Sequence, residues 1–166
     1  MAVAGLERHV HPDPRFEIDL PSGTELGIMP GVVLVARAPE SASSSPFRTN
    51  LTVVAQALPA GADPDRYAEL ALAEEAGSFP DWRLIDRAEA WIGELPAERT
   101  LATYRLSRSS GVDFGRELSV TVEQWRLVHE DLAWIVSASC ETGEYALVAD
   151  LWTACAESLR PGAGGR

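Results

Sequence analysis

Cysteine is scarce in this chain of 166 residues, which contains only Cys140 and Cys155. Two cysteines do not make the disulfide framework that stabilises small secreted domains. Cys140 ends an expected strand, and Cys155 lies on the apolar face of an expected helix. We therefore expect two reduced thiols in the core, with a single packing bridge between strand and helix as the alternative.

Positive charge is also limited, and no Lys/Arg cluster occurs. Lysine and arginine together number 14 against 25 aspartates and glutamates, so the net charge is −11. A chain this acidic repels the phosphates of nucleic acids and the surfaces of anionic membranes. We expect no nucleic-acid partner and no membrane partner; the charge serves solubility or attracts a cationic partner.

No long apolar run is present, and we expect no leader segment. No stretch approaches the roughly 20 apolar residues that a transmembrane helix needs. The first residues, MAVAGLERHVHPDP, lack the basic region followed by an apolar core that marks a signal peptide. The sequence therefore predicts a cytoplasmic protein.

Catalytic motifs are missing as well. The chain has no G-x-S-x-G, H-E-x-x-H or C-x-x-C, and its glycines lack the spacing and context of a phosphate loop. His129 and Asp131 are the only candidate catalytic pair, and they fall in an expected turn, where polar residues are common. We predict no catalytic residue and no cofactor, hence a protein that is not an enzyme.

A metal site is the next possibility to weigh. His9 and His11 stand two residues apart, with Glu7 and Asp13 close by. These are ligand types, but their spacing matches no standard metal motif. We interpret the set as part of a solvated tail and predict no metal.

The clearest pattern in the sequence runs from Glu117 to Glu141. Apolar residues alternate with polar ones from Leu118 to Val122 and again from Leu132 to Cys140. A period of two is typical of a β-strand, and the short polar break at 129–131 favours a hairpin turn. The pattern predicts two long antiparallel strands in the middle of a sheet.

The other elements complete an α+β domain. Asp63 and Pro64 fit the cap and first turn of a helix, and an apolar stripe through Trp152 predicts a second one. The expected order is βββ-α-ββββ-α, with a mostly antiparallel sheet. The length favours a single domain at 15–160, with 1–14 and 161–166 as flexible tails. The expected strands are 15–20, 32–38, 49–58, 82–92, 97–108 and the two of the hairpin; the expected helices are 63–77 and 143–159.

Several short segments carry a resemblance to a known family. They are Pro21 and Gly23 after the first strand, Phe47 and Asn50 in FRTNLTV, the stretch 131–139 (DLAWIVSAS), and Glu144-Tyr145 at the last helix. Together with the element order, they resemble the family of the photosystem protein PsbP. Its fold class includes the Ran-binding nuclear-import factor and bacterial DcrB-type and LpqN-type proteins. Thr24 departs from the pattern, since relatives usually have Trp there.

The resemblance implies an α/β/α sandwich around an antiparallel sheet. It also implies a binding or assembly factor rather than an enzyme, because most members are non-enzymatic. Some bacterial relatives serve as chaperones for secreted effectors. A shared fold by itself does not identify an activity.

Aromatic residues supply the candidate binding surface. Trp134 and Trp152 lie on apolar stripes and are expected in the core. By strand alternation, Trp125, Leu127 and Trp91 instead fall on the same face as polar residues of their strands. Such residues form a partner-binding face, or they lie beneath a covering helix of the same chain.

These observations together predict a non-enzymatic protein-binding or assembly module of a bacterial cell. It would act as an adaptor or chaperone, with a protein partner or by self-association. The alternative is a small-molecule binder or an enzyme whose pocket has no sequence motif.

Overall fold

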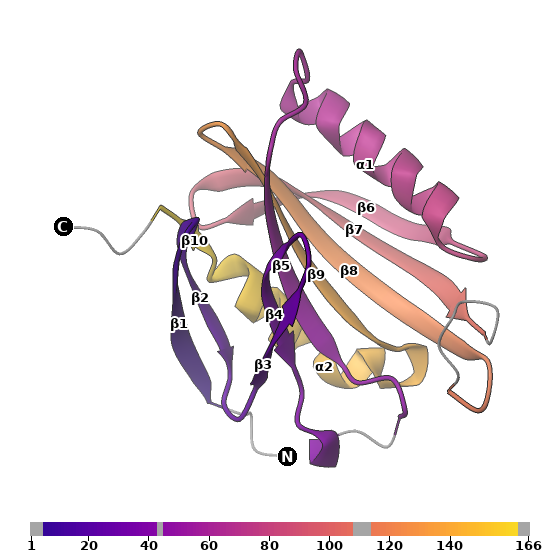
Figure 1. Cartoon of the computed structure of the whole chain (residues 1–166). Helices are drawn as coiled ribbons and strands as arrows, with labels where there is room; N and C mark the ends of the chain where they lie inside the picture. The colour runs from indigo at the N-terminus through magenta and orange to yellow at the C-terminus, as the bar shows by residue number, and fades with distance from the viewer. Residues whose placement is uncertain (1–4, 43–44, 108–113, 163–166) are drawn as a thin grey trace.

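The computed structural model describes residues 5–42, 45–107 and 114–162, which form two antiparallel sheets and two helices (Figure 1). A seven-stranded sheet has the order β3-β4-β5-β9-β8-β7-β6, and a three-stranded sheet has the order β1-β2-β10. Helix α1 lies on one face of the larger sheet. Helix α2 lies on the other, together with the smaller sheet. The expected α+β class is therefore confirmed.

The element bounds follow the predicted order, with three additional strands. Neither described helix has the length and apolar character needed to cross a membrane. Short 3-10 turns occupy Glu40–Ala42 and Thr142–Glu144. The elements are β1 Leu6–Pro12, β2 Arg15–Pro21, β3 Glu25–Met29, β4 Val32–Arg37, β5 Asn50–Ala57, α1 Pro64–Ser78, β6 Arg83–Ile92, β7 Leu95–Leu106, β8 Leu118–His129, β9 Leu132–Glu141, α2 Tyr145–Glu157 and β10 Arg160–Pro161.

Local signals correctly predict the central hairpin and the first helix. His129 pairs with Leu132 across the turn, and Val120 pairs with Glu141 at the far end. The side chain of Asp63 caps α1 by accepting from the backbone N–H of Arg66 at 2.8 Å. Both features depend on residues close in sequence, where such patterns are most informative.

The expected N-terminal tail is wrong, since part of it forms β1. This strand pairs with β2 along its length, from Leu6 opposite Pro21 to Pro12 opposite Arg15. Its side chains are mostly exposed, so no apolar alternation marks it in the sequence. The short strands β3 and β10 are likewise additions to the expected order. Residues 1–4 and 163–166 of the expected tails lie outside the described residues.

Strand β8 changes its apolar face halfway along its length. In its first half, Val120 and Val122 point to the α1 side and pack with Ala102 and Tyr104 of β7. In its second half Trp125 and Leu127 point to the α2 side, where they join the main core. The main core contains Phe16, Ile18, Leu20, Leu34, Ala36, Leu51, Val53, Ile92, Trp125, Leu127, Trp134, Val136, Ala138, Trp152, Cys155, Ala156 and Leu159.

Candidate functional site

Trp125 and Leu127 are buried and do not form a partner-binding face. They are only 1% and 3% exposed and lie in the core shared with α2 and β2. The expected binding face is therefore corrected for these two residues, and the alternative of cover by the chain's own elements is right. The alternation along β8 is misleading here because other elements cover both faces of the sheet. Side chains on either face of this strand are therefore shielded from solvent.

Trp91 is the third residue of that expected set, and it is exposed. It lies on β6, opposite Pro96 of β7, and its side chain is 61% exposed. Trp134 and Trp152, by contrast, are 2% and 4% exposed, which confirms their predicted place in the core. Trp91 is thus the large aromatic group that the described surface presents most openly.

Trp91 borders a groove between the start of α1 and the strands β6, β7 and β8. The groove has a volume of about 670 Å³ and is lined by both apolar and charged side chains. Pro64 and Tyr67 of α1 form one wall, and Trp91 and Pro96 belong to the opposite side. This size falls within the range of about 300–1,000 Å³ that is usual for ligand sites.

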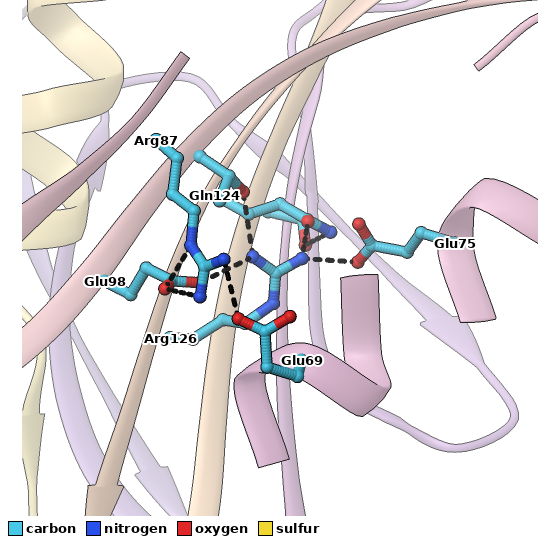
Figure 2. Close-up of polar contacts among 8 residues, drawn as sticks. Glu69, Glu75, Arg87, Glu98, Gln124 and Arg126 are labelled. Atoms are coloured by element: carbon cyan, nitrogen blue, oxygen red, sulfur yellow. Dashed lines mark hydrogen bonds and ion pairs between the residues drawn. The ribbon is translucent and has the colours of Figure 1, made fainter. Parts of the chain in front are cut away.

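A buried arginine on β8 anchors the floor of the groove. Arg126 is 3% exposed, and it donates to Glu75 of α1 at 2.6 Å and to Thr100 of β7 at 2.8 Å (Figure 2). It also donates to Gln124 on its own strand. Its Nε is buried without a hydrogen-bond partner among the described residues. The guanidinium therefore joins α1 to the sheet at the point where β8 loses its apolar row on this face.

A second arginine forms the side of the groove nearest the sheet edge. Arg87 of β6 contacts Glu69 of α1 at 2.7 Å and Glu98 of β7 at 2.6 Å (Figure 2). Hydrogen bonds from Arg87 to these two carboxylates raise the pKa of the guanidinium, so it stays charged. Glu98 also lies 3.9 Å from Arg126, which links the two arginines into one network.

The charge of the groove is negative in spite of its two arginines. Three carboxylates, those of Glu69, Glu75 and Glu98, already contact them. Asp65 and Glu89 are exposed carboxylates that also line the groove, and no hydrogen bond or ion pair is found for either among the described residues. Negative charge therefore remains without a partner at the mouth of the groove.

One signal for this network is present in the sequence, although parity alone does not reveal it. On one face of β8, the side chains change from apolar at Val122 to polar at Gln124 and Arg126. On the other face, they change from polar to apolar at Trp125. A crossing of this kind indicates that the core changes sides along the strand. Arg126 and Gln124 then stand on a covered face and require polar partners there.

The same crossing places a buried carboxylate on the opposite face. Glu123 is 1% exposed and pairs with Arg99 of β7, and it accepts from the Tyr145 hydroxyl of α2 at 3.2 Å. Arg99 also contacts Asp86 at 3.0 Å. Sequence reasoning missed this cluster too. It ties the start of α2 to the sheet, as Arg126 ties α1.

The remaining candidates from the sequence do not assemble into a site. His129 and Asp131 flank Glu130 at the turn between β8 and β9. His9 and His11 lie on β1 with ring centroids 6.4 Å apart. Within 5–42, 45–107 and 114–162, no group of three or more metal-binding side chains is found. Cys140 and Cys155 are both buried and free, which confirms the expected core thiols.

Comparison with known proteins identifies the fold. No family model matches the sequence, and no curated protein does either. Among solved structures, cyanobacterial PsbP from Synechocystis is 16% identical, with a TM-score of 0.62 over 97% of this chain and 95% of that one. LpqN of Mycobacterium tuberculosis, involved in cell envelope biogenesis, is 14% identical, with a TM-score of 0.64 over 93% and 89%.

A eukaryotic protein shows the same likeness. The Ran-binding protein Mog1p of Saccharomyces cerevisiae is 10% identical, with a TM-score of 0.60 over 95% of this chain and 96% of that one. Identities this low establish the fold and nothing more. The chain therefore has the fold shared by PsbP, LpqN and Mog1p, as its sequence resemblance implies.

Proposed function

We propose that the chain is a non-enzymatic protein-binding or assembly module, an adaptor or chaperone, in the cytoplasm of a bacterial cell. The observation that carries this proposal is the exposed Trp91 beside the groove, on a strand at the edge of the sheet. Tryptophan is among the residues that contribute most to protein interfaces. A sheet edge, in addition, offers backbone groups to an incoming segment.

The lining of the groove favours binding over chemistry. Of the described residues around it, none is serine, cysteine, histidine or lysine, so its only candidate acids and bases are three carboxylates and a tyrosine, those of Asp65, Glu89, Glu98 and Tyr67. Arg126 and Arg87 are already bound to carboxylates from α1 and β7. These groups hold the helix on the sheet, which is a structural task.

Proteins with the same fold give separate support. Mog1p of yeast is Ran-binding, and LpqN is involved in cell envelope biogenesis. Binding to a protein and building an envelope are both compatible with a module that binds or assembles. These roles belong to Mog1p and LpqN, and they support the proposal here by analogy of fold.

The test is affinity capture from the native host with three forms of the chain. Wild-type protein, Trp91→Ala and Leu147→Ala are compared by quantitative mass spectrometry. Leu147 is the matched control, because it is a 67% exposed apolar residue on α2, on the far side of the sheet. We expect a protein that wild type and Leu147→Ala retain and that Trp91→Ala loses. Equal recovery by all three forms contradicts the proposal.

The second candidate is a small-molecule binder or an enzyme, and the volume of the groove favours it. Native mass spectrometry of protein purified from the host would detect a retained small ligand. A ligand lost in Trp91→Ala but kept in Leu147→Ala would replace the protein-binding proposal. Light scattering distinguishes the remaining possibility, self-association, from a monomer that binds another protein.

A further inference from the structure

We propose that the groove and the adjoining edge of β6 bind an extended basic segment of a partner protein, which pairs with β6 as an additional strand. In this arrangement an arginine or lysine side chain lies across Trp91 and between Asp65 and Glu89. The proposal rests on the proposed function and names the chemistry of its partner.

The charge of the groove favours a cationic ligand. An anionic ligand is excluded because the two guanidiniums already face three carboxylates. Asp65 and Glu89 add negative charge, and neither carboxylate has a hydrogen bond or ion pair among the described residues. Asp65 lies in the first turn of α1, where the helix dipole offsets part of its charge, so Glu89 is the less compensated of the two. A cation is therefore the complementary ligand, and the net charge of −11 would favour its approach.

A like-charge pair spans two neighbouring strands beside the groove. Glu89 of β6 lies directly opposite Glu98 of β7. Like charges in this position destabilise a sheet. Glu98 is compensated by Arg87 at 2.6 Å and by Arg126 at 3.9 Å, whereas Glu89 has no partner among the described residues. A cation bound beside Glu89 would relieve this repulsion.

Trp91 lies two residues beyond Glu89 on the same face of β6. The face of an indole ring attracts a guanidinium or ammonium group by about 0.5–2 kcal/mol. At 61% exposure, the ring is accessible to such a group. Trp91 and Glu89 thus present a cation site with an aromatic wall and a carboxylate.

The free edge of β6 favours a strand over a free cation as the ligand. β6 is ten residues long, forms one edge of the larger sheet, and has β7 as its only hydrogen-bonded neighbour in the described chain. Its outer backbone groups are available to a segment in extended conformation. Side chains of that segment would alternate, and every second one would reach the face that carries Glu89 and Trp91.

The experiment uses a short fluorescein-labelled peptide that alternates arginine with threonine, and fluorescence anisotropy at low salt. We expect wild type and Leu147→Ala to bind it equally. Trp91→Ala and the double variant Asp65→Asn/Glu89→Gln should each bind about tenfold more weakly. The same peptide with glutamate in place of arginine should not bind. Added salt should weaken binding, since the contact is electrostatic.

Two further probes test the strand and the cation separately. Methylation of alternate backbone nitrogens removes donors from the peptide, so the methylated peptide should not bind. Spermine carries the charge without a peptide backbone and should not displace the peptide at equal concentration. Equal binding by all variants, by the methylated peptide, or displacement by spermine would each overturn the proposal.

The outcome is separable from that of the affinity capture. The wild type can capture a partner through Trp91 and yet fail to bind the arginine peptide. That result supports the proposed binding function and rejects the basic segment as the ligand. If wild type and Trp91→Ala recover the same proteins in the affinity capture, the proposed protein-binding function itself is rejected.

Discussion

Arg126 on β8 donates to Glu75 on α1 at 2.6 Å, across 51 residues of sequence. The arginine side chain is 2% exposed and the glutamate side chain 17%, so the pair is largely removed from water. It joins the helix to the sheet where Gln124 and Arg126 interrupt the apolar row of β8 on that face, between Val122 and Val128. The groove depends on this pair, because α1 is one of its walls.

Replacement of Arg126 by methionine should lower the free energy of unfolding by about 3–5 kcal/mol. Removal of one member of a buried pair leaves the other charge without compensation. Glu117→Gln is the control, since both side chains of the Arg105–Glu117 pair are more than half exposed. That change should cost less than about 1 kcal/mol. Urea unfolding measures both values, and similar losses would contradict a structural role for Arg126.

The two tryptophans Trp125 and Trp91 should respond oppositely to truncation. Trp125→Ala leaves a cavity in the main core and should cost about 3–5 kcal/mol. Trp91→Ala removes an exposed ring and should change the stability by less than about 0.5 kcal/mol. Thermal and urea unfolding provide the comparison. A large loss for Trp91→Ala would mean that this side chain supports the fold.

Glu89→Gln should stabilise the protein by about 0.2–1 kcal/mol. The change removes one charge of the like-charge pair with Glu98, while the shape of the side chain is kept. A higher urea midpoint is the expected result. If Glu89→Gln has a higher urea midpoint and also binds the peptide more weakly, Glu89 contributes to binding and lowers the stability of the fold. A lower midpoint would reveal a stabilising partner of Glu89.

Stability should fall in alkaline solution, because three buried acids are kept protonated by the fold. Burial raises the pKa of Tyr104, Cys140 and Cys155 to about 12 each, from ordinary values of 10.0 for the tyrosine and 9.0 for the cysteines. The unfolded chain releases these protons first as the pH rises. The contribution is therefore complete below about pH 9 and is lost progressively toward pH 12.

Urea midpoints measured at several pH values above about 8 would follow this loss. Each group accounts for a slope of up to about 1.4 kcal/mol per pH unit. Tyr104→Phe removes one of the three groups, so its stability should fall less steeply above about pH 10. A wild-type stability that does not change over this range would show that the three groups titrate normally in the folded protein.

Sequence patterns are a good guide where structure depends on neighbouring residues. Alternation locates β8 and β9, and Asp63 followed by Pro64 locates the start of α1. β1 escapes detection because its order comes from pairing with β2 rather than from an apolar row of its own. Its exposed and charged residues resemble those of a tail.

The site is harder to predict because it depends on contacts between distant segments. Parity on a strand distinguishes two faces, but it does not tell which face is covered. For this reason parity points to a surface position for Trp125, which α2 in fact covers. The crossing of apolar rows along β8 indicates that Arg126 lies on a covered face, but the identity of its partner has no local signal, since Glu75 lies on a helix far earlier in the chain. Of the three residues expected on a binding face, Trp91 alone is exposed, and its binding role stays a prediction.

The reversal of apolar faces along β8 also restricts how this strand can align with its neighbours. In a strand of uniform alternation, a slip by two residues keeps every apolar side chain on the core side. In β8 such a slip would bring Glu123 to the place of Trp125 in the main core, or Gln124 to that of Val122. A slip by one residue would exchange the faces altogether. One alignment of these twelve residues is thus favoured over every nearby alternative, which protects the central ladder from mispairing as the chain folds.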